Sequence, residues 1–403
     1  LIIAMTNFLK RSISMYSESY FSLWRCLFGL YLLYYSLAIL PYLTTLYSNK
    51  GIYLSYEFLP FFPNLLMLSD SVYVVYALGA LSVVLSLCIL LGWRRNWCAL
   101  LLWFVLTTFY GRNLFTENPA LPFIGLLLLL LVIIPSGERW SLDRRRKKDS
   151  DVWVMPHLAY FGALFVLGAS YSLSGFDKLQ ALGWQRGDAM AHLYTLPIAY
   201  EHFLGELLRA QPMWLVKAET WAVAYSMLLS FPLLLIPQTR KYMWLILTFM
   251  FCFALVVFDL TEVALGMLLF HFFLFDPEWI STKENRKPIV LWYDTNCKLC
   301  TAYVNEIKLQ DESAITTFKS IYDYPDGKHD ETPNTIIVEQ DGKILRQSEA
   351  VIAHLKALGG VLGFLAMFMS LVPRAVRDSI YDFVGRHRYR WFGKIDTSSQ
   401  EKK

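Results

Sequence analysis

Long apolar segments follow one another along the first 280 residues. We delimit eight of them, with polar stretches between: 20–46, 72–91, 97–110, 119–134, 152–174, 214–236, 243–258 and 263–275. Since about 20 apolar residues in a helix cross a bilayer core of roughly 30 Å, the pattern predicts a mostly α polytopic membrane bundle of about eight spans. The third, fourth, seventh and eighth segments are short for that thickness, so they would begin in flanking polar turns or be partly re-entrant.

The pattern changes after residue 287. A short apolar segment at 289–293 predicts a buried strand, and the spacing of Leu299, Tyr303 and Ile307 predicts a helix after a turn at 294–296.

Further strands are predicted at 315–321 and in a hairpin of 334–338 with 344–346, which turns on Asp341 and Gly342. Pro333 stands just before the hairpin. It is either a cis-proline that lies beside Cys297 and Cys300 or an ordinary loop proline.

We therefore expect a C-terminal α/β domain behind the membrane bundle. The predicted division is a cytoplasmic amino-terminal segment at 1–19, a transmembrane domain at 20–279, a linker at 280–287, a dithiol domain at 288–394 and a polar tail at 395–403.

Composition and charge support a membrane protein and predict its orientation. Hydrophobic residues make up 56% of the chain and charged residues 17%, with a net charge of +4. Basic residues cluster in alternate loops, which the positive-inside rule assigns to the cytoplasm. The clusters lie at Lys10 and Arg11, Arg94 and Arg95, 139–148, Arg240 and Lys241, and 283–287. The amino terminus and the dithiol domain then share the cytoplasmic side of a bacterial type of inner membrane.

Cys297 and Cys300 are the two cysteines, of six, that invite chemistry. A thiol at a helix start lies near the positive end of the helix dipole, which favours the thiolate. Cys297 is therefore the expected nucleophile, and Cys300, one turn later, the thiol that resolves a mixed disulfide. Half of a zinc site and two inert buried cysteines are the alternative interpretations. No metal is expected, since the chain has no second CxxC and His329, His354 and His387 lack ligand spacing.

The segment that follows residue 287 resembles the DCC family of thiol-disulfide oxidoreductases, named for an Asp-x-x-Cys-x-x-Cys motif. The motif is formed here by Asp294, Cys297 and Cys300, and the runs TIIVEQDGKILRQSEA at 335–350 and VPRAVRDSIYDFVGRHRYRWFG at 372–393 also match. Thr295 stands where the family usually has glycine. The resemblance implies a thioredoxin-like fold that acts on a protein or small-molecule disulfide without a bound cofactor. Asp294 is expected to assist proton transfer or to hold the turn.

Lys178 is the second candidate site, at the end of the fifth apolar segment. An ionisable residue there is either a membrane-edge anchor or functional. The chain from about residue 20 to 278 resembles the horizontally transferred transmembrane (HTTM) domain of vitamin K-dependent gamma-carboxylases. The matching runs are ERWSLD at 138–143, SGFDKL and GWQRGDAM within 174–190, and ALGMLLFHFFLFDPEW at 264–279.

In that family the matching lysine is the proposed base that deprotonates a reduced quinone, so the resemblance implies this role for Lys178 and a vitamin K-like quinone as cofactor. His192, His202 and His271 are candidate helpers. The dithiol domain replaces the long region that engages the glutamate substrate in the carboxylases. We therefore favour a membrane-anchored thiol-disulfide oxidoreductase. The alternatives are a carboxylase-like or quinone-using enzyme and a non-catalytic membrane module that carries a redox domain.

Two further expectations complete the prediction. The apolar run 359–373 is too short to span a bilayer, and the basic residues that follow it predict either contact with anionic lipid or a solvated basic face. No motif for nucleic-acid binding is present. The partners expected are the lipid bilayer, a disulfide and, for the membrane domain, a quinone. Because five spans precede Lys178 and eight precede the cysteines, the two sites are expected on opposite sides of the bilayer.

Overall fold

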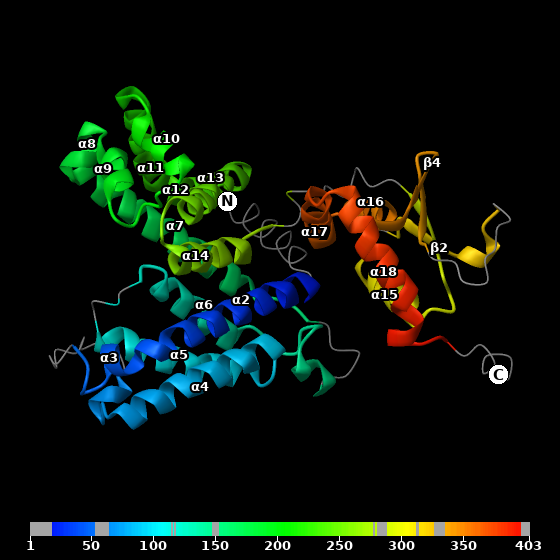
Figure 1. Ribbon diagram of the computed structural model, residues 1–403, viewed down its shortest axis with the longest axis horizontal. Helices are drawn as coiled ribbons and strands as arrows, with labels where there is room; N and C mark the ends of the chain where they lie inside the picture. Colours follow the sequence, from blue (N-terminus) through cyan, green and yellow to red (C-terminus); the bar gives the residue numbers. More distant parts are fainter. Residues whose placement is uncertain are drawn as a thin grey trace, which may run out of the picture. The chain divides into compact units, whose positions relative to one another are not determined.

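The computed structural model describes residues 18–52, 64–113, 116, 118–146, 153–276, 279, 288–311, 314–325 and 335–395. The expectations for Lys10, Arg11, Pro333, the linker 280–287 and the tail after 395 fall outside these residues. The chain forms two compact units, residues 1–275 and 276–403, hereafter unit 1 and unit 2 (Figure 1).

The regular secondary structure described in unit 1 is helical, apart from an isolated β-bridge between Ala199 and Phe258, and its helices form two groups. The first group comprises α2 (Glu18–Ile39), α3 (Leu43–Tyr47), α4 (Val72–Leu91), α5 (Arg95–Arg112) and α6 (Leu121–Ile133). The second group comprises α7 (His157–Gln180), α8 (Leu182–Arg186), α9 (Ala189–Thr195), α10 (Phe203–Ala210), α11 (Met213–Leu228), α12 (Ser230–Leu235) and α13 (Pro237–Val257). Helix α14 (Thr261–Phe273) packs against α2, α6 and α13, and so joins the groups (Figure 1).

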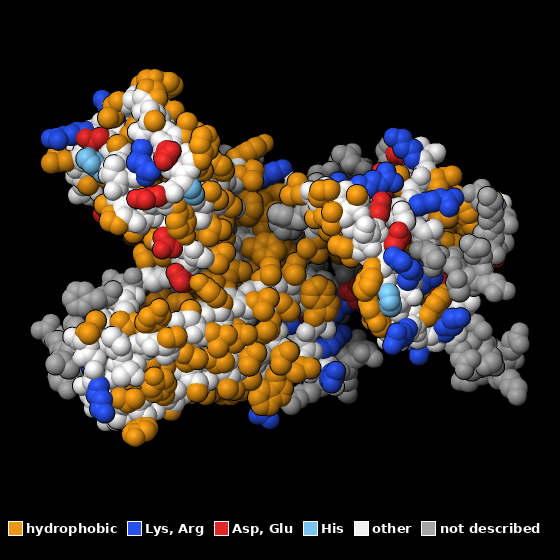
Figure 2. Space-filling model, in the orientation of Figure 1, with side chains coloured by type: hydrophobic (Ala, Val, Ile, Leu, Met, Phe, Trp, Pro, Cys, Tyr) orange, Lys and Arg blue, Asp and Glu red, His pale blue; other side chains and the backbone are white. Residues whose placement is uncertain are grey.

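Every one of the eight apolar segments coincides with helix, but four described helical segments are long and apolar enough to cross a membrane. They are 18–47, 72–91, 157–180 and 237–257. Helices α6 and α14 are apolar but have 13 residues each. Many large hydrophobic side chains of unit 1 face outward, as lipid contact requires (Figure 2). The segment between Lys178 and Met213, which joins the fifth and sixth apolar segments, contains α8, α9 and α10.

Several charged side chains of unit 1 are buried in protein contacts. Arg25 Nε lies 2.5 Å from Glu138 Oε1 and Arg95 Nε lies 3.7 Å from Glu138 Oε2, and all three side chains are fully buried. Arg240, also buried, donates to the carbonyl oxygen of Leu234 at 2.7 Å. Arg95 and Arg240, two of the basic residues on which the predicted orientation rests, are therefore both buried in protein contacts.

Unit 2 contains a four-stranded mixed sheet in the order β2-β1-β3-β4. The strands are β1 (Ile289–Tyr293), β2 (Thr316–Ser320), β3 (Ile337–Gln340) and β4 (Lys343–Arg346), and the helices are α15 (Lys298–Gln310), α16 (Gln347–Leu358), α17 (Gly360–Leu371) and α18 (Arg374–Phe392). β1 runs parallel to β2 and antiparallel to β3. The predicted hairpin turn is confirmed: Asp341 and Gly342 have φ of 50° and 73°, as a two-residue hairpin turn requires.

β1 is a central strand with both faces buried. Ile289 and Leu291 pack with Val304 of α15 and Ala350 of α16. Trp292 packs on the other face with residues that include Ile321 and Ile337. The packing of β1 on both faces fixes the position of its carboxyl end. The turn 294–296 and the start of α15 follow directly from that end.

Candidate active site

Cys297 is the N-cap residue of α15, at the helix start that the sequence predicted. Its backbone is extended (φ −96°, ψ 120°), and its sulfur accepts a hydrogen bond from the Cys300 amide at 3.4 Å. The first amide groups of a helix have no partner within the helix, so they and the helix dipole favour negative charge on a capping group. The Cys297 sulfur therefore occupies the capping position at the amino end of α15.

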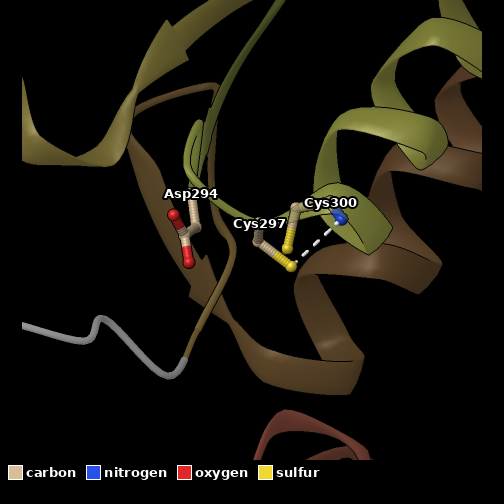
Figure 3. Close-up of side chains that lie close together, drawn as sticks. All are labelled: Asp294, Cys297 and Cys300. Carbon is tan, nitrogen blue, oxygen red and sulfur yellow. Dashed lines mark hydrogen bonds between the residues drawn. The ribbon is translucent and has the colours of Figure 1, made fainter. Parts of the chain in front are cut away.

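The two sulfurs are not bonded to each other and lie side by side (Figure 3). The side chain of Cys297 is fully buried and that of Cys300 is 7% exposed. Burial, and then the hydrogen bond with Cys297, raise the pKa of the Cys300 thiol far above its ordinary value. Cys300 therefore stays protonated at neutral pH, which suits the thiol that resolves a mixed disulfide.

The end of the domain lies across the cysteine turn. Cys297 forms an antiparallel bridge with Lys394, and the Ile395 amide donates to the carbonyl oxygen of Asn296 at 2.9 Å. The Lys298 amide donates to the Gly393 carbonyl oxygen at 3.4 Å. Because Cys297 has no exposed surface, a substrate sulfur can reach it only after this turn or the 393–395 segment moves.

Asp294 is held by four donors. Its Oδ1 accepts from the Asn296 amide at 3.0 Å and from the Tyr322 hydroxyl at 3.1 Å. Its Oδ2 accepts from Arg388 Nη2 at 2.7 Å and from the Tyr389 hydroxyl at 2.5 Å. Asp294 and Arg388 are both almost fully buried, so the carboxylate ties α18 to the cysteine turn. These contacts favour the turn-holding role over the proton-transfer role.

Arg388 and Tyr389 are site residues that no local sequence pattern predicted. Arg388 lies 94 residues beyond Asp294, and no spacing rule connects positions so far apart. The run 372–393 that carries the family resemblance contains both residues, and it was the one signal that could have pointed to them.

Asp294, Cys297 and Cys300 form the one group of metal-ligating side chains found among the described residues. Their ligand atoms lie within 4.8 Å of one another. A structural zinc site needs four ligands, and both oxygens of Asp294 already accept hydrogen bonds. This arrangement suits two exchanging thiols better than a closed metal site.

His354 belongs to a separate buried network behind the sheet. Its Nδ1 lies 2.9 Å from the Tyr303 hydroxyl and its Nε2 lies 3.1 Å from Thr316 Oγ1. Burial lowers the pKa of His354 to about 4. The histidine is therefore neutral at physiological pH and joins α15, α16 and β2.

Lys178 lies in the last turn of α7. Its amine donates to Ser174 Oγ at 2.9 Å and lies 5.4 Å from the centre of the Trp184 ring. Gly175, beside it, allows α7 to approach α11 closely: a Cβ there would lie 2.3 Å from the Leu228 nitrogen.

The three histidines considered as helpers of Lys178 have described contacts elsewhere. His271 is buried between Tyr171, at 2.9 Å, and Thr248, at 3.2 Å. His202 caps α10, and His192 lies 3.9 Å from Asp188.

A bundle of apolar helices followed by an α/β domain with a helix-capping CxxC defines a membrane protein that carries a thiol-disulfide redox domain. Comparison with known proteins agrees. The model of the HTTM domain family matches residues 15–279, and the model of the DCC1-like thiol-disulfide oxidoreductases matches residues 291–394. The chain belongs to the HTTM domain family and carries a DCC1-like domain after it.

Two curated relatives match the dithiol domain. The uncharacterized protein YuxK of Bacillus subtilis is 29% identical over 120 residues, which cover 28% of this chain and 87% of the relative. The DCC family protein At1g52590, chloroplastic, of Arabidopsis thaliana is 28% identical over 123 residues, which cover 28% of this chain and 70% of the relative. No solved structure matches the chain significantly.

Proposed function

We propose that the protein is a membrane-anchored thiol-disulfide oxidoreductase in which unit 2, a thioredoxin-like domain, carries the chemistry. The observation that carries this proposal is the capping position of Cys297, whose sulfur accepts from the amide of Cys300. That position favours thiolate at the attacking sulfur, while burial keeps the second sulfur protonated.

The reaction follows from the two sulfurs. The Cys297 thiolate attacks one sulfur of a substrate disulfide, and the other substrate sulfur leaves as a thiolate that takes up a proton from water. Cys300 then loses its proton and attacks Cys297 Sγ, which releases the second substrate sulfur as a thiol. Two electrons pass to the substrate, which becomes a dithiol, and Cys297 and Cys300 become a disulfide. A cellular thiol or dithiol reductant must then reduce this disulfide.

Asp294 acts in this scheme through the backbone rather than through proton transfer. Its bonds to the Asn296 amide and to Arg388 and Tyr389 hold the turn that presents Cys297. Asp294 is therefore a positioning residue, as are the two side chains of α18.

A single-turnover assay tests the activity. The full-length protein, with Cys26, Cys88, Cys98 and Cys252 replaced by alanine, is reduced, freed of reductant and mixed with an aromatic disulfide. We expect two equivalents of aromatic thiol per chain.

In the same background, Cys300→Ser should release one equivalent and retain the other as a mixed disulfide, and Cys297→Ser should release almost none. Release that is unchanged by Cys297→Ser would contradict the proposal. The alanine background without further change is the matched control.

The topology that we propose keeps eight spans, with the amino terminus and unit 2 in the cytoplasm of a bacterial type of cell. Helix α5, the short helices α6 and α14, and the pair α11 and α12 would add four spans to the four longer ones. The basic residues Arg94 and Arg145, both exposed, support this orientation. A reporter after Lys403 should read cytoplasmic and one near Gln185 external; the reverse at Lys403 would contradict the count.

A second activity at Lys178 is supported by the contacts of its amine. The amine donates to the hydroxyl of Ser174 and faces the ring of Trp184, and the carboxylate of Asp177, the preceding residue, is its charged neighbour. A reduced quinone would be the substrate. Quinone that copurifies with the protein, and that is lost in Lys178→Met but not in Lys217→Met, would support this role.

A further inference from the structure

Helix α18 has a buried face and an exposed face, and a row of mostly apolar side chains runs along the exposed face. Val376, Ile380, Phe383, His387 and Trp391 follow one another at spacings of three and four residues, which places them along one side of a helix. The apolar members are between 48% and 59% exposed. We call these five residues the outer stripe.

The side chains of the outer stripe are ordered against one another. The ring of His387 lies 4.6 Å from that of Phe383 and 5.1 Å from that of Trp391, centre to centre. His387 Nδ1 is also 2.8 Å from the Phe383 carbonyl oxygen. A continuous apolar row on a solvent-facing helix is unusual in a soluble domain and indicates a surface that binds a partner.

Positive charge flanks the outer stripe. Arg386 and Arg390 are exposed on α18 beside it. The two acidic residues of α18 point the other way: Asp378 accepts from Ser348 and Asp382 from Gln347, both on α16. The charges next to the stripe are therefore basic, which complements an anionic partner.

The chain itself indicates which anionic partner lies within reach. Unit 2 begins after α14, and residues 274–288 separate Phe273 from β1. At about 3.3–3.6 Å per residue this connection spans at most about 50 Å, so the dithiol domain cannot move far from the bilayer that holds unit 1. Aromatic and aliphatic side chains flanked by arginine are typical of helices that lie in the headgroup region of anionic membranes.

We propose that α18 lies along the anionic phospholipid surface of the bilayer that holds unit 1. The outer stripe enters the headgroup boundary, and Arg386 and Arg390 contact lipid phosphates. The opposite face of α18 holds Asp294 through Arg388 and Tyr389. The docked helix therefore sets the cysteine turn about one helix diameter, roughly 10 Å, from the lipid surface. The docking does not depend on the redox activity.

The test uses the full-length protein in lipid nanodiscs. A polarity-sensitive fluorescent amino acid replaces Phe383 on the outer stripe or, as a control, Lys343 on the exposed strand β4. The discs contain phosphatidylcholine alone or with phosphatidylglycerol, and nitroxide lipids serve as quenchers. We expect a blue shift and strong quenching at position 383 in anionic discs, and neither at position 343.

Charge reversal then separates lipid from other occupants. Each basic residue near an anionic surface contributes about fivefold to binding, so Arg386→Glu/Arg390→Glu should weaken docking by at least roughly thirtyfold. The variant Lys343→Glu/Lys356→Glu changes the net charge equally away from α18 and should have little effect. Salt at about 1 M should also release the helix, because it shortens the Debye length to about 3 Å.

Three results would overturn the proposal. One is a probe at 383 that is quenched no more than the probe at 343. Another is a blue shift without lipid quenching, or one that persists in detergent, because unit 1 or a second copy of the chain would then cover the stripe. The third is quenching that does not change with phosphatidylglycerol or with charge reversal. Hydrogen exchange of the unlabelled wild-type protein provides an independent measurement: the peptide 374–392 should exchange more slowly in anionic discs than in phosphatidylcholine.

Discussion

Replacing Arg388 by methionine should loosen the whole dithiol domain. The Arg388 side chain is 4% exposed and that of Asp294 is 1% exposed, with 2.7 Å between the paired atoms. Removal of one partner from a buried ion pair costs about 3–5 kcal/mol, because the other charge stays buried. Asp294 keeps its bonds from Tyr389, Tyr322 and the Asn296 amide, so we expect the lower end of that range.

Hydrogen exchange of the β1 backbone in the full-length protein measures this loss. About 3 kcal/mol corresponds to more than a hundredfold faster exchange for amides that open with the domain. The matched control is Arg390→Met, which removes an exposed arginine two residues further along the same helix. This variant should change the exchange rate of β1 less than threefold.

A double variant identifies the cause. Asp294→Asn with Arg388→Met removes both charges, so no unpaired charge stays buried, and much of the lost stability should return. Exchange in Arg388→Met that rises less than about fivefold would refute the reasoning, because Asp294 would then be satisfied by its other donors.

Three further predictions concern single residues. Since burial raises the pKa of Cys300, alkylation of the full-length protein at neutral pH should label Cys297 first. Cys300 should gain reactivity only at strongly alkaline pH. Preferential labelling of Cys300 would reverse the assigned roles. His354 has a folded pKa of about 4, below its unfolded value of about 6.5, so the free energy of unfolding of unit 2 should fall by roughly 3 kcal/mol as the pH falls from 6.5 to 4. Hydrogen exchange measures this change, and the variant His354→Gln should lose the pH dependence. Gly175→Ala should force α7 away from α11 at a cost of about 1–3 kcal/mol and lower the thermal midpoint in detergent, whereas Gly162→Ala in the same helix, with open space around its Cβ, should not.

Local patterns were enough to predict most of the elements. The CxxC helix start, the hairpin at Asp341 and Gly342 and the helical nature of the apolar segments each depend on residues a few positions apart, and the structure confirms them. Such features follow from backbone geometry and periodicity, which the sequence contains directly. The same local information identified Cys297 and Cys300 as the pair to examine.

Long-range partners could be found only in the tertiary structure. Glu138 meets Arg25 and Arg95 inside unit 1, and Arg388 crosses 94 residues to reach Asp294. A charged side chain looks the same in a sequence whether it faces water or is buried against an opposite charge. Burial is decided by the packing of distant segments, which local periodicity does not encode. For this reason the sequence predicted where the thiols lie on their helix, while only the fold determined which side chains hold their turn in place.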